Sequence, residues 1–198
     1  SFAPLLISSF ITIIVGVFPL IFVRKTEDIR LAEGFAITVF AWILSCIFGM
    51  LPYLMWGGEF TLPNAFFESV SGFTTTGATI LNDIESLPKG LLFWRSSTHF
   101  IGGVGVVVFT LLVLPSMSTF RFKMTKMEIS SLSKDNYKFR TRELIKIIIS
   151  TYISITICTF ISLWIAGMSP SDAMNHAFSV VATGGFSTKN ISIMAFDS

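Results

Sequence analysis

The sequence is poor in charged residues for its length. Of its 198 residues, 13% are Asp, Glu, Lys or Arg, whereas 52% are hydrophobic and the mean hydropathy is +0.74. Soluble globular domains carry about 25% charged residues, so a soluble domain of this size could not cover its surface with so few. The deficit favours a membrane protein, with the lipid bilayer as its main partner. The net charge of +2 indicates no particular further partner.

The sequence also has only two cysteines, and it shows neither the pattern of a leader segment nor a cluster of reactive side chains. Cys46 and Cys158 both lie in apolar runs, where they are expected to be small buried hydrophobes, and they form no metal or redox pattern. No charged start with a cleavage site is present, so we expect no signal peptide. Because the chain starts inside an apolar run, we expect it to be a piece of a longer protein. The apolar runs lack paired carboxylates, histidine clusters or a Ser/Lys dyad, so we predict no enzyme, no catalytic residues and no cofactor.

Four apolar runs are long enough to cross a bilayer, which takes about 20 mostly apolar residues in a helix. They cover residues 2–23, 33–56, 91–114 and 143–166. We expect the third run to stop at Pro115, because proline breaks the hydrogen-bond ladder of a helix. The predicted fold class is therefore an all-α membrane protein.

Two shorter apolar segments, residues 64–72 and 172–181, cannot span a bilayer at about 1.5 Å per residue. Asn64 and Asp172 are good N-cap types, so we expect each to begin a short helix. Each segment then runs into a Thr-x-Gly sequence and a polar return. This pattern is typical of a re-entrant segment, whose irregular backbone is tolerated at membrane depth only where it is buried in protein or lines a wet cavity.

Lysine and arginine are concentrated in two places along the chain. The link at residues 24–30 carries three, and the segment from 121 to 146 carries eight. The positive-inside rule places both links in the cytoplasm, and both short segments then enter from the outer face. A juxtamembrane basic link is typical of an orientation signal, a lipid-headgroup contact or a docking site for a cytosolic protein. We expect no nucleic-acid binding.

The two Thr-x-Gly sequences belong to an internal repeat with a constant shift of 108 residues. The shift places Trp56 on Trp164, Ser71 on Ser179, Thr75 on Thr183 and Gly77 on Gly185. Rings of backbone carbonyls replace the hydration shell of the ion in potassium channels, and glycine accepts the unusual dihedrals that aim them. We predict an ion path, with K⁺ as the only metal, bound through backbone oxygens of Thr75, Thr76, Gly77, Thr183, Gly184 and Gly185. The plainer alternative is a pair of external turns.

Several ionisable side chains accompany these loops. Glu68 lies inside the first short segment, and the repeat shift puts His176 opposite it. Ionisable groups at membrane depth are costly and often functional, but holding the loop backbone would be enough for Glu68, so we assign Glu68 and Arg95 as candidate filter support. Arg95 either pairs with Glu68 or reaches the outer headgroups. We predict that His99 is a hydrogen-bonded interior histidine, and that Gly102, Gly103 and Gly105 let helices approach closely.

Three runs resemble the Trk/Ktr/HKT potassium transporter superfamily, most closely its bacterial TrkH-type branch. The first pore loop is similar to residues 66–79 (FFESVSGFTTTGAT), the following helix to residues 94–105 (WRSSTHFIGGVG), and the second pore loop to residues 177–188 (AFSVVATGGFST). The resemblance implies a potassium pore of four helix–loop–helix repeats, with one filter strand from each. It also implies a cytosolic nucleotide-binding regulatory subunit, and we further expect a homodimer in the bacterial inner membrane. Holding two of four loops, the chain alone should not form a complete pore.

The predicted organisation is a series of tandem parallel helix–pore loop–helix repeats, as in potassium channels. It comprises a first helix and cytoplasmic link at 1–31, the first repeat at 32–118, the basic link at 119–142 and a truncated second repeat at 143–198. The predicted function is potassium uptake, and coupling to protons or sodium, as in a symporter, stays open. Two other interpretations also stay open: a secondary transporter with broken helices, which calls for inverted repeats, and a non-conducting structural subunit.

Overall fold

The structure, a computed structural model, is all-helical over the residues that it describes. The backbone is described for residues 2–22, 31–123 and 132–196, and the side chains for 2–22, 33–107 and 143–196. The helices are α1 Phe2–Phe22, α2 Leu31–Gly49, α3 Leu51–Trp56, α4 Leu62–Phe73, α5 Lys89–Lys123, α6 Leu132–Ile165 and α7 Pro170–Val181, followed by the 3₁₀ turn η1 Ser192–Ala195. The predicted all-α membrane fold is confirmed.

Three helical stretches in the described part of the chain are long and apolar enough to cross a membrane: Phe2–Phe22, Glu33–Trp56 and Glu143–Ile165. Many of their large apolar side chains are exposed, as expected of helices that face lipid. The span predicted at 91–114 lies within α5 and extends past the residues whose side chains are described. Its predicted end at Pro115 is wrong, because α5 continues to Lys123. Proline is tolerated in membrane helices where neighbouring groups satisfy the freed carbonyl.

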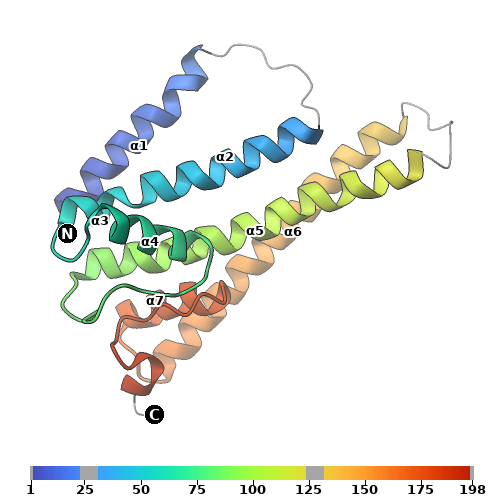
Figure 1. Cartoon of the computed structure of the whole chain (residues 1–198). Helices are drawn as coiled ribbons and strands as arrows, with labels where there is room; N and C mark the ends of the chain where they lie inside the picture. The colour runs from blue at the N-terminus through green and yellow to red at the C-terminus, as the bar shows by residue number, and fades with distance from the viewer. Residues whose placement is uncertain (1, 23–30, 124–131, 197–198) are drawn as a thin grey trace.

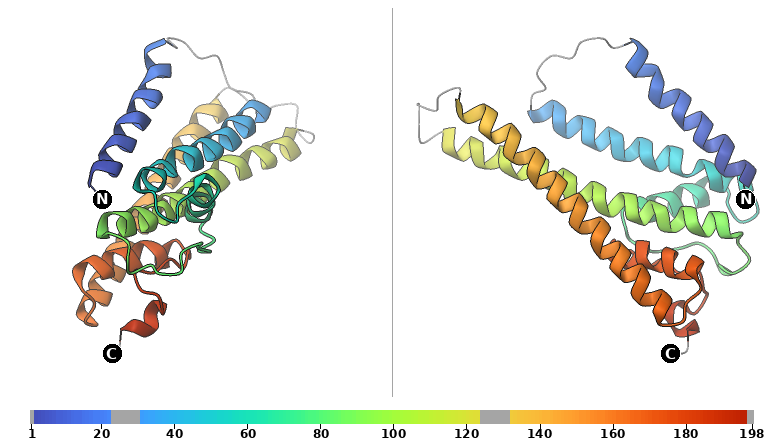
Figure 2. Two further views of the ribbon diagram at one scale, coloured as in Figure 1. Left: turned by 60° about the vertical axis from the view of Figure 1, so that its left-hand side comes forward. Right: turned by 180° about the vertical axis from the view of Figure 1, so that it is seen from behind.

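The short helices gather at one end of the molecule. In Figure 1, α3, α4 and α7 lie together, whereas the last turns of α1 and α5 and the first turns of α2 and α6 lie toward the opposite end. The view from behind in Figure 2 shows the same division. Helices α4 and α7 thus lie away from the described helix ends that flank the predicted cytoplasmic links (Figure 1). The lysines and arginines at 24–30 and 121–142 are outside the residues whose side chains are described, so the cytoplasmic placement of these links stays a prediction.

Helix α5 belongs to the first repeat and also contacts the helices of the second. It packs against α4 on one side and against α6 and α7 on the other. A β-carbon at Gly102 would collide with the backbone carbonyl of Phe73, at the end of α4, and one at Gly103 would come close to Ala182, just after α7. The small residues of α5 therefore allow the backbones of both short helices to approach it, as the sequence predicts.

An apolar cluster fixes α3 and α4 against the start of α5. Tyr53, Phe60, Ala65, Leu87, Leu91 and Leu92 are all buried in it. The rings of Tyr53 and Phe60 lie 5.0 Å apart between centroids. This packing anchors α4 against the start of α5 and so positions the loop that follows α4.

Candidate functional site

Helices α4 and α7 are two copies of one element. Adding 108 to the bounds of α4, Leu62–Phe73, gives those of α7, Pro170–Val181. The predicted N-caps Asn64 and Asp172 are wrong by three residues, because Thr61 and Ser169 hold the cap positions. Each helix has a proline in its first turn, where the missing N–H is not needed, so each begins before the polar residue that suggested its start.

The chain leaves each helix through the same turn. The φ angle is 54° at both Thr75 and Thr183, 76° at Gly77 and 89° at Gly185. The same backbone hydrogen bonds close both turns: Thr75 N to Gly72 O and Thr76 N to Ser71 O in the first, and Thr183 N to Val180 O and Gly184 N to Ser179 O in the second. Positive φ is uncommon outside glycine, and such strain persists only where the surroundings enforce it. The two loops thus share one unusual backbone conformation.

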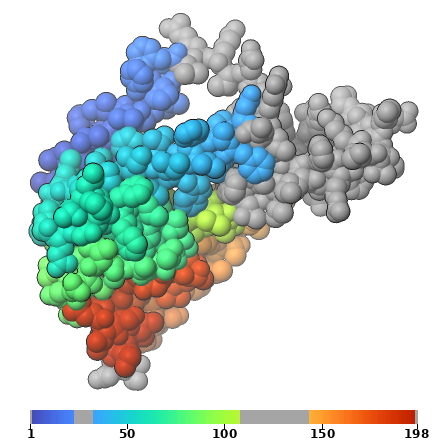
Figure 3. Space-filling view, viewed as in Figure 1, coloured from blue at the N-terminus to red at the C-terminus, as the bar shows by residue number. Residues whose placement is uncertain are grey.

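The two loops meet at a pair of glycines. A β-carbon at Gly77 would collide with the backbone carbonyl of Gly184, and one at Gly184 would collide with the imidazole ring of His99. The structure therefore brings residues 75–77 and 183–185 together. Three of these six residues are exposed in this chain, namely Thr76, Thr183 and Gly185. On the face shown in Figure 3, the green surface of the first repeat adjoins the red surface of the second.

A carboxylate and an imidazole hold the segments that follow the two glycines. Thr79 Oγ1 donates to the carboxylate of Glu68, with distances of 2.9 and 3.0 Å to its two oxygens, and the backbone N–H of Ile80 donates to Oε2 at 3.2 Å. In the second repeat, His176 Nε2 lies 3.0 Å from Ser187 Oγ. Both pairs are 11 residues apart and related by the repeat shift. Two chemically different side chains therefore occupy the same supporting position.

Arg95, on α5, links Glu68 to the segment that follows the second glycine. Its Nε donates to Glu68 Oε1 at 2.7 Å, and the two side chains are 1% and 0% exposed. Its Nη1 donates to the carbonyl of Ser187 at 3.3 Å, and its guanidinium carbon lies 4.0 Å above the ring of Phe186. Of the two alternatives for Arg95, the structure shows the pair with Glu68. One buried cation therefore contacts both repeats just beyond the glycines.

His99 is an interior histidine. Its side chain is 0% exposed, Nδ1 lies 3.2 Å from Ser179 Oγ, and its ring stacks on Phe186 with 4.0 Å between centroids. Among the described residues, no group of three His, Cys, Asp or Glu side chains is placed to hold a metal ion. His99 instead fills the space directly behind Gly184.

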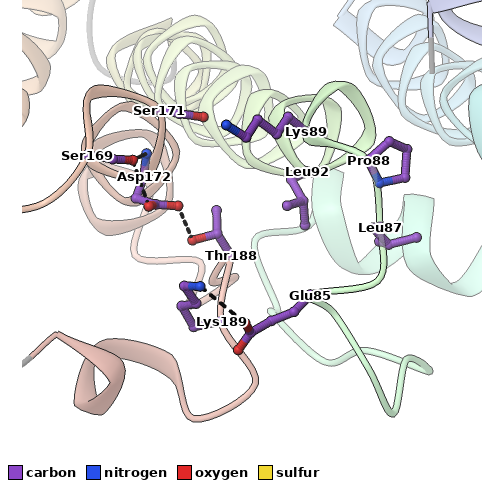
Figure 4. A pocket seen from close by; sticks show the side chains of 10 residues that line it. All are labelled: Glu85, Leu87, Pro88, Lys89, Leu92, Ser169, Ser171, Asp172, Thr188 and Lys189. Atoms are coloured by element: carbon purple, nitrogen blue, oxygen red, sulfur yellow. Dashed lines mark hydrogen bonds and ion pairs between the residues drawn. The ribbon is translucent and has the colours of Figure 1, made fainter.

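A second polar cluster joins residues 83–85 of the first repeat to residues 189–190 of the second. Asn190 Oδ1 accepts from Ile84 N at 2.7 Å, and its Nδ2 donates to Asp83 Oδ1 at 2.9 Å. Lys189 Nζ pairs with Glu85 at 3.1 Å. A cavity of about 440 Å³ lies beside this cluster, between the start of α5 and the start of α7. Figure 4 shows that its wall combines charged and hydroxyl side chains from both repeats.

Asp172 belongs to this wall and to the cap of α7. Ser169 Oγ accepts from Asp172 N at 3.2 Å and donates to Oδ2 at 2.7 Å, while Thr188 Oγ1 donates to Oδ1 at 2.7 Å. Burial by itself raises the pKa of Asp172, but the hydrogen bonds from Thr188 and Ser169 and the nearby Lys189 and His176 together hold it below its ordinary value. The ionised carboxylate thus stabilises the first turn of α7.

Sequence reasoning found the two loops, Glu68 and Arg95, but missed several contacts between the repeats. It also missed the contact between His176 and Ser187 within the second repeat, which the shift of 108 relates to that between Glu68 and Thr79. The contacts of Asn190 with Asp83 and Ile84 join segments that are 106 and 107 residues apart. No periodicity or local motif marks them, so only the fold shows them.

These features define an all-helical membrane protein with two parallel helix–loop repeats. The model of the TrkH family, described as cation transport protein, matches residues 4–198. The chain therefore belongs to the TrkH family, and its suspected resemblance to this group is confirmed.

Individual relatives agree with this assignment. The chain is 38% identical over 178 residues to the Trk system potassium uptake protein TrkH of Salmonella typhimurium, covering 88% of this chain and 37% of that protein. It is 37% identical to TrkG of Escherichia coli, covering 86% and 36%. The crystal structure of the potassium transporter TrkH from Vibrio parahaemolyticus matches with a TM-score of 0.81 and 31% identity, over 99% of this chain and 39% of that one. The chain thus spans well under half the length of these relatives.

Proposed function

We propose that this chain supplies two adjacent repeats of a bacterial potassium uptake pore. Potassium is the transported ion, and its path passes the backbone oxygens of Thr75, Thr76, Gly77, Thr183, Gly184 and Gly185. Glu68 and Arg95 support these strands from behind. Transport of this kind needs no covalent chemistry, so we propose no catalytic residue.

The observation that carries the proposal is the shared backbone conformation of the two loops. Both turn through a threonine with φ of 54° and then a glycine with positive φ, and they face each other at Gly77 and Gly184. Carbonyl oxygens aimed at a common path can replace the water around a dehydrated cation. Helices α4 and α7 both end at these loops, and the C-terminal end of a helix carries partial negative charge that favours a cation. The names of the relatives, which are potassium uptake proteins, agree with this ion.

The remaining features of the whole protein are proposals from the family resemblance. Two further helix–loop repeats complete the pore, a cytosolic nucleotide-binding subunit regulates it, and the protein forms a homodimer in the inner membrane. The parallel arrangement of the repeats favours this function over a secondary transporter built from inverted repeats. Exposure of Thr76, Thr183 and Gly185 leaves room for the missing strands.

Substitution of Gly77 by serine tests the proposal. In bacteria that lack their own potassium uptake, the full-length protein carrying this chain is expected to restore rubidium entry. Gly77→Ser is expected to abolish the preference for potassium over sodium, because its side chain would displace the Gly184 carbonyl.

Gly57→Ser is the matched control. Gly57 has φ of 78°, close to the 76° of Gly77, but a β-carbon there meets nothing within 4 Å. Gly57→Ser also places a side chain at a positive φ, but away from the loops, and is expected to keep the ion preference. Unchanged selectivity and rate in Gly77→Ser would refute the assignment of the filter residues.

A further inference from the structure

The side chains that hold the two loops, Glu68 and His176, make hydrogen bonds to equivalent residues but differ in chemistry. In the first repeat, Leu81 N donates to Thr79 Oγ1 at 3.2 Å, and that hydroxyl donates to Glu68. In the second, Lys189 N donates to Ser187 Oγ at 3.0 Å, and Ser187 Oγ meets His176. Because the positions differ by 108 throughout, His176 does for the second loop what Glu68 does for the first.

The contacts of His176 determine which of its nitrogens carries the proton. Nδ1 lies 2.8 Å from the carbonyl oxygen of Asp172, which can only accept, so Nδ1 carries the hydrogen. In the neutral ring Nε2 is then an acceptor, and the hydroxyl of Ser187 donates to it. The ring is buried, with 3% exposed, and Ser187 is 7% exposed. The neutral ring thus satisfies every polar group in this contact.

We propose that His176 is a positioning residue for the second loop, and that it holds the loop only in its neutral form. This inference rests on the proposed function. A protonated ring has donors on both nitrogens, so Nε2 would then donate to Ser187 Oγ, which already accepts from Lys189 N. The Ser187 hydroxyl hydrogen would lose its acceptor inside the protein, which is unfavourable. Acidification would therefore loosen the segment that follows Gly185.

The charged groups around His176 come from three elements. Asp172 lies on the same helix, four residues earlier, and its carboxylate is held by Ser169 and Thr188. Lys189 follows the second loop and pairs with Glu85. Arg95, on α5, reaches the Ser187 carbonyl and is neutralised by Glu68. The edge of the ring also meets Phe196 at 5.3 Å between centroids. The two nearby cations, Lys189 and Arg95, are already paired. The experiment must therefore distinguish the effect of His176 from that of Asp172, the other titratable group.

The experiment measures rubidium uptake by the full-length protein in proteoliposomes, at equal pH inside and outside. The pH is varied between about 8 and about 5, the range in which histidine is the usual switch. The wild type is expected to lose uptake and potassium preference as the pH falls. His176→Gln offers an amide oxygen to Ser187 without titrating, so its uptake is expected to stay constant over this range. His176→Ala is expected to have reduced uptake at every pH.

Two further variants make the result specific. Ser187→Ala removes the donor and is expected to abolish the dependence on pH, and Asp172→Asn is expected to retain the loss in acid. A wild-type pH profile in His176→Gln, or its disappearance in Asp172→Asn, would overturn the role of His176. So would wild-type uptake that does not change with pH. Absence of rubidium uptake at any pH would instead remove the proposed function itself, and this inference with it.

Discussion

Arg95 Nε lies 2.7 Å from Glu68 Oε1, and both side chains are almost completely buried. Arg95 also donates to the Ser187 carbonyl, and Glu68 accepts from Thr79. One ion pair thus contacts the segments that follow both glycine loops. Removing one partner of a buried pair leaves an uncompensated charge, which costs more than the intact pair contributes.

Breaking this pair is expected to destabilise the protein strongly. Glu68→Gln or Arg95→Met alone should lower the free energy of unfolding by about 3–5 kcal/mol, because each leaves one buried charge without its partner. The double variant should cost less than the two single changes added together. Denaturant unfolding of the full-length protein in detergent measures these values.

The exposed pair of Glu143 and Lys146 is the control for this cycle. Its side chains are 46% and 72% exposed, with 3.0 Å between the charged atoms. Exposed pairs contribute about 0–1 kcal/mol, so Glu143→Gln and Lys146→Met should have small effects. Additive losses for Glu68 and Arg95 would contradict the coupling inferred from the structure.

The helices and the two equivalent loops could be predicted from the sequence, because their signals lie in the local pattern of residues. Apolar run length gave the helices, and the constant shift of 108 residues gave two equivalent loops. The helix starts were missed because Asn64 and Asp172 were taken as N-caps, whereas Pro63 and Pro170 already lie in the first helical turn. The end of α5 was missed because Pro115 was taken as a stop. Contacts between the repeats, such as Arg95 with Ser187, depend on packing around α5 and have no local signal.

Gly184 is expected to tolerate no side chain. A β-carbon there would overlap the imidazole of His99, so Gly184→Ala should lower the free energy of unfolding by about 1–3 kcal/mol. In a His99→Ala background the same change should cost less, since the overlap is removed. Unfolding of the four proteins of this cycle measures the difference.

Gly16→Ala serves as the control for that cycle. Gly16 lies in α1, and a β-carbon there meets nothing within 4 Å. In a helix interior alanine is favoured over glycine by about 0.5–1 kcal/mol, so no loss is expected. Equal costs of Gly184→Ala with and without the ring of His99 would show that another contact excludes the side chain.

Asp172 should make stability depend on pH in the acidic range. Its pKa in the folded protein is lower than its ordinary value, which it regains on unfolding. The stabilisation is therefore complete above the ordinary pKa of the carboxyl and is lost as the pH falls through the lower, folded value. Asp172→Asn should remove this component, which is read from the difference between the two unfolding curves as a function of pH. A difference that grows as the pH falls would have the wrong sign.

The polar contact between residues 83–85 and residues 189–190 should depend more on Asn190 than on Lys189. The side chain of Asn190 makes two hydrogen bonds to the other repeat, one with the backbone of Ile84 and one with the Asp83 carboxylate. Lys189 forms an ion pair with Glu85 whose side chains are 35% and 44% exposed, and such pairs contribute about 0–1 kcal/mol and weaken in salt. Both hydrogen bonds of the Asn190 side chain are exposed, so Asn190→Ala is expected to cost about 0.5–1.5 kcal/mol. Lys189→Met is expected to cost less, and its effect alone should shrink as salt is raised. Unfolding at low and high salt checks both values, and a larger, salt-insensitive loss for Lys189→Met would show that the ion pair, and not the asparagine, joins the two repeats.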